Sequence, residues 1–319
     1  QTQGSTPCKT GAKAFLRDGK VLAGTVGGGW IETQTETQAA VAQQPVVLEI
    51  KLEGETIHAS GPICGGSVRL LLDPQAASHG DAYTAAANFQ KRRHRGVLLT
   101  QISSPTRPTV TVRALSEATI SSSAGFPGER AIRLTLEQGQ PQLFVSDSTP
   151  KDQRIEVLVE PVLPKPLLLI VGGGHVGQAV AAQGHLVGFD LIVIDDRREF
   201  ADPRLFPDSA TIYHGTVAQR LADCPLDQDT YVVIATYSHQ QDAEALARCI
   251  REPIAYLGMI GSQRKVSMMR RDFVKSDRAT MAEFDRVYAP MGLEIGAVTV
   301  PEIAASIVAQ IIAVRRGRT

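Results

Sequence analysis

The chain is 319 residues long and 43% hydrophobic, so it can bury the cores of two ordinary domains. With 33 basic and 33 acidic residues its formal net charge is zero, which leaves no basic stripe for nucleic acid and no acidic tail. No apolar run approaches the roughly 20 residues of a transmembrane helix, and no signal peptide is apparent. These features argue against nucleic-acid and membrane partners.

The spacing of the cysteines indicates the cellular compartment. The four cysteines lie far apart without a C-x-x-C pair, which argues against a disulfide framework or a zinc cage and favours a reducing compartment. The reducing compartment predicted from the cysteines is the cytoplasm.

The chain starts at Gln1 rather than at methionine, which predicts that its natural N-terminus is truncated.

The N-terminal half mixes strand and helix patterns. Asp18-Gly19 lies between two short apolar runs and predicts the tip of a hairpin. Apolar residues over 100–150 alternate, which is typical of strands; examples are Val110 and Val112, and Ile132, Leu134 and Leu136. Further elements are predicted from apolar patterns as strands over 13–16, 21–25, 46–52 and 67–72 and a helix over 31–42.

Two features of this half could carry chemistry. Gly27, Gly28 and Gly29 stand between a predicted strand and a predicted helix, where exposed amides could cradle an anion. A glycine turn that merely allows close packing is the simpler interpretation. Cys64, flanked by glycines, could offer a thiolate to a soft metal or to sulfur chemistry, although free cysteines are more often buried and inert.

A proline-rich segment over 161–166 separates this half from a regular alternation of strands and helices. We expect an N-terminal domain over 1–160 and a C-terminal domain over 167–319. Alternation of this kind predicts right-handed crossovers and a parallel sheet. The predicted elements of this domain are strands over 167–171, 191–194, 211–213, 231–235 and 255–257 and helices over 176–186, 217–222 and 241–251.

The most informative segment is 167–195. A buried strand leads into a G-x-G-x-x-G turn, a helix, a second strand and then Asp195. This is the order of a dinucleotide-binding unit, in which a pyrophosphate lies on the helix N-terminus and the acid accepts hydrogen bonds from a ribose. The candidate cofactor-binding residues here are Gly172, Gly174, His175, Gly177 and Asp195.

The next two strands also end in polar residues, at the edge of the sheet where ligands bind in doubly wound folds. His239 and Asp242 follow the fourth strand, and His239 or Ser238 could instead simply cap the next helix. Ser262, Arg264 and Lys265 follow the fifth strand, where they could bind a phosphate or be an exposed polar group. The sequence therefore predicts an α/β protein with a C-terminal Rossmann-like doubly wound parallel sheet and a separate N-terminal α/β domain with a mixed sheet.

Eight segments in a fixed order resemble the xanthine dehydrogenase accessory protein family, XdhC/CoxI. They read STPCKTGAKAFL, GTVGGGWIE, CGGSVRLLLDP, IVGGGHVGQAVA, DDRREFAD, VIATYSHQQDAEAL, YLGMIGSQRK and PMGLEIGAVTVPEIAASIVAQII. This chain departs from the family pattern in three places. The opening helix and strand before Ser5 are absent, Tyr237 replaces the first histidine of a Thr-His-x-His motif, and Pro301 follows Val300.

The resemblance implies a chaperone that binds molybdenum cofactor, protects it during sulfuration and delivers it to a xanthine dehydrogenase-type hydroxylase. It also implies that Cys64 contacts the molybdenum or its terminal sulfur, that a cysteine desulfurase could be a partner, and that the protein is an accessory factor rather than a catalyst. A homodimer is compatible with this role. The alternative from the glycine motif is an NAD(P)-dependent oxidoreductase with His239 and Lys265 as acid–base groups. A docking protein that binds its partner without cofactor is a third hypothesis.

Overall fold

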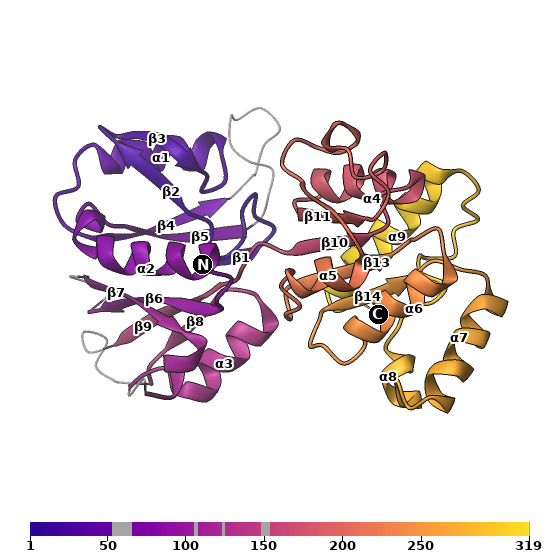
Figure 1. The fold of residues 1–319 in the computed structure, drawn as a ribbon. Coiled ribbons are helices and arrows are strands. Elements are labelled where there is room, and N and C mark those ends of the chain that lie inside the picture. The colour runs from indigo at the N-terminus through magenta and orange to yellow at the C-terminus, as the bar shows by residue number, and fades with distance from the viewer. Residues whose placement is uncertain (53–65, 105–107, 123–124, 148–153, 319) are drawn as a thin grey trace. The chain divides into compact units, whose positions relative to one another are not determined.

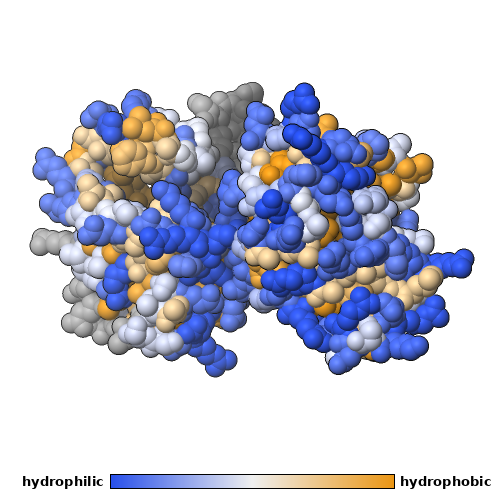
Figure 2. Space-filling model, viewed as in Figure 1, coloured by the Kyte–Doolittle hydropathy of each residue, from blue (hydrophilic) through white to orange (hydrophobic). Residues whose placement is uncertain are grey.

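The computed structural model describes residues 1–52, 66–104, 108–122, 125–147 and 154–318. The chain divides into two compact units, Gln1–Pro164 and Lys165–Thr319. Strands and helices form both units (Figure 1). On the drawn face of each unit most side chains are hydrophilic, and smaller apolar patches lie among them (Figure 2). Among the helices described, none combines the length and the apolar character needed to cross a membrane.

The C-terminal unit is built around a parallel sheet of five strands: β10 (Leu167–Val171), β11 (Asp190–Asp195), β12 (Thr211–His214), β13 (Thr230–Ile234) and β14 (Tyr256–Met259). They lie in the order β12-β11-β10-β13-β14. Numbered along the chain this order is 3-2-1-4-5, in which the connections change direction beside the first strand. The predicted Rossmann-like doubly wound sheet is confirmed.

Helices cover both faces of this sheet: α4 (His175–Leu186), α5 (Val217–Ala222), α6 (His239–Cys249), α7 (Gln263–Lys275), α8 (Met281–Asp285) and α9 (Val300–Arg315), with a short 3-10 helix at Pro203–Leu205. Leu168 and Ile170 lie in the core cluster that α4 and α9 cover. Leu169 and Val171 lie in the cluster that α5 to α8 cover. Because both faces are buried, β10 is apolar at every position rather than alternating.

The N-terminal unit contains antiparallel sheets. Their strands are β1 (Thr2–Gly4), β2 (Ala14–Arg17), β3 (Lys20–Gly24), β4 (Val46–Leu52), β5 (Gly66–Leu72), β6 (Gly96–Ser103), β7 (Thr109–Ser116), β8 (Gln142–Val145) and β9 (Ile155–Val162). The sheet orders are β1-β5-β4, β2-β3 and β7-β6-β9-β8. Among the described residues every strand pairing of this unit is antiparallel, so its sheets are antiparallel where the sequence predicted a mixed sheet.

Among its described residues this unit also contains the helices α1 (Gly29–Ala39), α2 (Gly80–Lys91) and α3 (Glu129–Gln138), with 3-10 helices at Ala76–His79 and Glu117–Ser122. Asp18 and Gly19 both have positive φ, at 52° and 72°, which confirms the predicted hairpin tip between β2 and β3. The strand predicted from the apolar pattern at Ile132–Leu136 was wrong, because this segment lies in α3. Ile132 and Leu136 are buried four residues apart, whereas Leu134 is 47% exposed, which is helical periodicity.

Candidate functional site

The turn after β10 brings the chain back on itself at the carboxyl edge of the sheet. Gly172 has a φ of 114°, and a Cβ there would lie 2.2 Å from the carbonyl oxygen of Ala235 at the end of β13. A Cβ on Gly177 would lie 2.0 Å from the carbonyl oxygen of Gly172. These two glycines are therefore required by the close packing of the turn against its own helix and the neighbouring strand.

Gly174 has a different environment from its neighbours. It is the N-cap of α4, and the nearest atom to a Cβ built on it is Arg197 Nη2, at 3.9 Å. Without a capping side chain, the first amides of this 12-residue helix keep donors that helix geometry leaves unpaired. Such amides, together with the helix dipole, favour a phosphate or another anion.

Asp195, at the end of β11, is only 3% exposed and accepts four hydrogen bonds from its own chain. Its Oδ1 accepts from the backbone amide and Nε of Arg197, at 2.9 and 3.0 Å. Its Oδ2 accepts from the backbone amide of Gly173 and from Nη2 of Arg197, both at 2.8 Å. The ribose-binding role expected of Asp195 would require the Arg197 side chain to move away.

The charge of Asp195 follows from these contacts. Burial favours the neutral acid, but the hydrogen bonds from the side chain and amide of Arg197 and from the amide of Gly173 outweigh it and hold the pKa of Asp195 below its ordinary value. The carboxylate is thus ionised and paired with the guanidinium at neutral pH.

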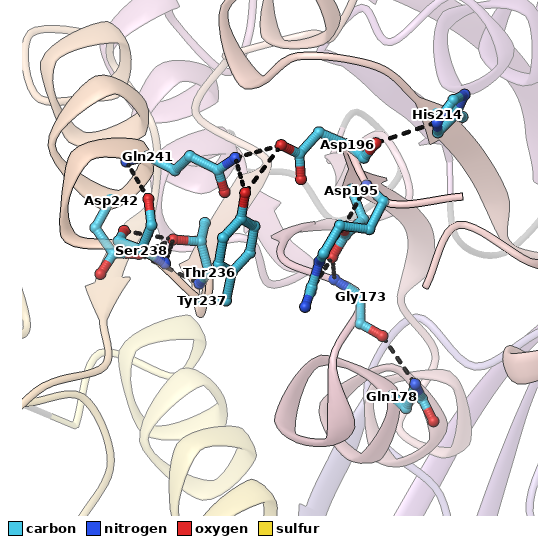
Figure 3. Close-up of polar contacts among 11 residues, drawn as sticks. Gly173, Gln178, Asp195, Asp196, His214, Thr236, Tyr237, Ser238, Gln241 and Asp242 are labelled. Atoms are coloured by element: carbon cyan, nitrogen blue, oxygen red, sulfur yellow. Dashed lines mark hydrogen bonds and ion pairs between the residues drawn. The ribbon is translucent and has the colours of Figure 1, made fainter. Parts of the chain in front are cut away.

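Aromatic rings fix the Arg197 guanidinium. The centre of the Phe200 ring lies 3.9 Å from its carbon Cζ and that of the Tyr237 ring 4.3 Å from it. Tyr237 also donates a hydrogen bond of 3.3 Å to Oδ2 of Asp196, which accepts a second one of 2.6 Å from Nε2 of Gln241 (Figure 3). No motif in the sequence predicted that Arg197, Phe200, Asp196 and Gln241 would form one group.

A second polar group joins β13, α6 and α7. Asp242 has no exposed surface and accepts hydrogen bonds from the amide and Oγ1 of Thr236, at 3.2 and 2.6 Å (Figure 3). Its other oxygen is paired with Nζ of Lys265. Asp242 was predicted at the ligand-binding edge of the sheet, but these contacts bury it, and it links the segment after β13 to α7.

The other predicted residues of this unit are exposed. His175 and His239 are the first residues of α4 and α6, and Ser262 and Arg264 lie at the start of α7. Ser238 caps α6 by accepting a hydrogen bond from the Gln241 amide, and Ser262 caps α7 in the same way through the Lys265 amide. The helix-cap interpretation of Ser238 is therefore confirmed.

The N-terminal glycine loop is occupied by a side chain of its own segment. Oε1 of Glu32 accepts hydrogen bonds from Thr25 Oγ1 and from the amides of Val26 and Gly28, at 2.6, 3.3 and 3.2 Å. The Gly27 amide donates to Thr25 Oγ1 at 3.1 Å. An anion at Gly27–Gly29 would have to displace the carboxylate of Glu32, so this loop is a poorer cradle than the turn before α4.

The cysteines divide by environment. Cys64 lies outside the described residues. Burial raises the pKa of Cys224 to about 11 and that of Cys249 to about 12, so both thiols stay protonated in the core. In the part of the chain that the structure describes, no three His, Cys, Asp or Glu side chains gather as metal ligands.

The N-terminal unit also holds a cavity of about 490 Å³. Apolar side chains such as Val47, Leu70 and Leu158 line it, with the buried carboxylates of Glu156 and Glu160 on its wall. Glu156 is paired with Arg69, and Glu160 with Lys13. None of the candidate site residues that the structure describes lines this cavity.

Comparison with known proteins matches part of each unit to models of related domains. The model of the XdhC Rossmann domain matches residues 168–311, and that of the XdhC and CoxI family matches residues 1–50. The uncharacterized protein YqeB of Escherichia coli K12 is 40% identical over 155 residues, which are 47% of this chain and 28% of that protein. A Bacillus subtilis protein named as a probable subunit of xanthine dehydrogenase is 28% identical over 165 residues, 52% of this chain and 48% of that protein.

The matched regions thus span about a quarter of the first relative and about half of the second. A crystal structure of a xanthine dehydrogenase from Bacillus halodurans is similar in fold, with a TM-score of 0.74 over 100% of this chain and 90% of that chain at 23% identity. Each unit of the chain carries a match to a model of the same family, at opposite ends of the sequence. Both units are therefore similar to the XdhC and CoxI family over the matched residues.

Proposed function

We propose that this protein binds molybdenum cofactor and supplies it to a xanthine dehydrogenase-type molybdenum hydroxylase. The observation that carries the proposal is the uncapped N-terminus of α4 at Gly174, whose first amides and helix dipole favour the phosphate of a pterin, with the guanidinium of Arg197 beside it as a further donor group. The choice of cofactor and partner is supported by the matches to the XdhC and CoxI family models and by two similar proteins that are named after xanthine dehydrogenase.

The chain's own residues would hold and shield the group rather than transform it. Gly174, His175 and Gly177 would place amides around the phosphate, and the guanidinium of Arg197 would add donors while its charge stays paired with Asp195. The cofactor supplies the molybdenum and its dithiolene sulfurs, which are the redox-active part. Protection during sulfuration, a contact between Cys64 and the metal, a cysteine desulfurase partner, a homodimer and a cytoplasmic location complete the proposal. Ser262, Arg264, His239 and the Gly27–Gly29 loop are its secondary candidates for contacts.

The test is the cofactor content of the protein purified without oxygen from a host that makes molybdenum cofactor. We expect molybdenum and pterin each to be present at a molar ratio to the protein that is close to one. Gly174→Asp should lose most of both, because a carboxylate at the N-cap would occupy and repel the phosphate position. Gly128→Asp is the matched control, since Gly128 is also an N-cap glycine with open space around it and a similar φ of −66°.

Aspartate is a favoured N-cap residue, so neither substitution should unfold the protein. Equal molybdenum content in the two variants would contradict the phosphate position. Wild-type protein free of molybdenum and pterin would contradict the function itself.

The runner-up is an NAD(P)-dependent oxidoreductase, which the glycine motif and the 3-2-1-4-5 strand order favour. Its acid–base groups are less suited to the task in this structure, because Lys265 is paired with the buried Asp242. A rise in melting temperature with millimolar NAD or NADP would support it.

A further inference from the structure

The acid that follows the second strand of a dinucleotide-binding fold recognises the ribose by accepting hydrogen bonds from its hydroxyls. In this chain that acid is Asp195, and each of its oxygens already accepts two hydrogen bonds. Two of the four donors are backbone amides, those of Gly173 and Arg197, which are fixed by the fold. The other two are Nε and Nη2 of the Arg197 side chain, one on each oxygen.

This arrangement has a direct consequence for a ribose. Without the Arg197 side chain, each oxygen of Asp195 would keep one backbone donor and regain one acceptor position. A pair of vicinal hydroxyls needs two such positions. Arg197 therefore occupies the same acceptor sites that a ribose diol would use.

The Arg197 side chain is also held in place from several elements. Phe200 lies against one side of its guanidinium and Tyr237, from the loop after β13, also contacts it. Tyr237 is anchored in turn by Asp196, which Gln241 of α6 also contacts (Figure 3). Displacing Arg197 would break two charged hydrogen bonds and both ring contacts together.

We propose that Arg197 is the specificity-determining residue of this site and closes it to the adenosine ribose of NAD-type dinucleotides. The proposal rests on the proposed function only in that both assign the ligand to the carboxyl edge of the sheet beside Gly174. The chemistry that remains is that of a phosphorylated group without a ribose diol at this position, such as the phosphate arm of a pterin. The protein would thereby avoid capture by abundant nicotinamide and adenine dinucleotides.

The test is calorimetric titration of the full chain with NAD, comparing wild type with Arg197→Met. Methionine keeps an unbranched stem between the two rings and lacks donors. We expect the variant to bind NAD at least tenfold more tightly than wild type. The gain should vanish with NAD that lacks the adenosine 2′-hydroxyl. Arg198→Met is the matched control, because Arg198 is exposed on the same segment, and it should bind like wild type.

Three results would overturn the proposal. Equal NAD affinity in wild type and Arg197→Met would show that Arg197 does not close the site. NADP binding by wild type that is lost in the variant would make Arg197 a ligand of a 2′-phosphate instead. A folded variant that binds no NAD would show that something other than Arg197 blocks the ribose. If methionine disturbs the two rings, Arg197→Ala is the second variant for the same titration. The molybdenum content of wild type is a separate measurement, so either idea can fail alone.

Discussion

Asp195 is the residue on which the geometry of the site depends most, because its carboxylate joins the glycine turn to Arg197. It is nearly fully buried, yet it stays charged because four donors surround it. A buried charge is tolerated only when it is paired and hydrogen-bonded in this way. Asp195 therefore holds the glycine turn through its bond to the Gly173 amide, and it is linked to the ring of Tyr237 through Arg197.

Removing the Arg197 side chain should destabilise the protein in a pH-dependent way. At pH 7 we expect Arg197→Met to lower the free energy of unfolding by about 2 kcal/mol, because two hydrogen bonds to a charged group are lost. The pKa of folded Asp195 lies below the value of about 3.9 for an unfolded aspartate. Ionised Asp195 thus contributes stability above roughly pH 4, and this is lost as the pH falls through the folded-state pKa.

The difference between wild type and Arg197→Met should accordingly shrink in urea titrations carried out at progressively lower pH. A difference that stays constant from pH 7 to below the folded-state pKa of Asp195 would mean that the ring contacts of Arg197, and not its pairing with Asp195, account for the loss.

Gly177 leaves no room for a side chain, and the cost of adding one can be measured. Gly177→Ala should lower the free energy of unfolding by about 1–3 kcal/mol, because the added Cβ would collide with the Gly172 carbonyl and force the turn to shift. Gly80→Ala is the control: Gly80 is also helical, has open space around it and should tolerate alanine. Denaturant unfolding of both variants checks this, and equal stability would show that the turn adjusts without cost.

At the scale of elements, the link between Asp242 and Lys265 joins α6 to α7 beneath the carboxyl edge of the sheet. Lys265→Met should lower the free energy of unfolding by about 3 kcal/mol, because it leaves a fully buried carboxylate without its cation. Arg264→Met removes a neighbouring exposed cation and should stay within about 0.5 kcal/mol of wild type. If both variants unfold at the wild-type urea concentration, Asp242 must be stabilised adequately by Thr236 alone.

Elements whose signals are local could be predicted from the sequence. The strand at Leu167–Val171 was found to the residue, since five consecutive apolar residues before a glycine turn have few other interpretations. The start of α9 also has a local signal, because Thr299 and Glu302 lie three residues apart and form a capping box. Alternating apolar residues misled at α3, where one exposed leucine imitates strand periodicity.

Contacts between distant residues could not be predicted in this way. Arg197 and Arg198 are identical neighbours in the sequence, and only the fold decides which of them turns toward Asp195. The ring of Tyr237 reaches Arg197 from another strand end, 40 residues later in the chain (237 − 197). The one local signal for the pairing of Asp195 with Arg197 was the acid followed two residues later by arginine, a spacing that lets both oxygens meet the guanidinium.

At the scale of the whole molecule, the described apolar cores follow the two units. The two clusters that sandwich the parallel sheet contain only residues after 165, and the three remaining clusters contain only residues before it. Each unit thus buries its own apolar side chains, which is what independent folding requires. The glycine turn, Asp195, Arg197 and Tyr237 all belong to the second unit.

The C-terminal unit should therefore fold when it is expressed alone as residues 165–319. We expect a single cooperative heat-unfolding transition by calorimetry, since one sheet with helices on both faces forms one cooperative core. The pairing of Asp195 with Arg197 should persist in it, so that Arg197→Met has the same pH-dependent effect as in the full chain. A fragment of residues 172–319 is the control, because it lacks β10, the central strand, and should remain unfolded. If 165–319 is also unfolded while the full chain is stable, the sheet depends on the N-terminal unit, and the crevice beside Gly174 is a property of the whole chain.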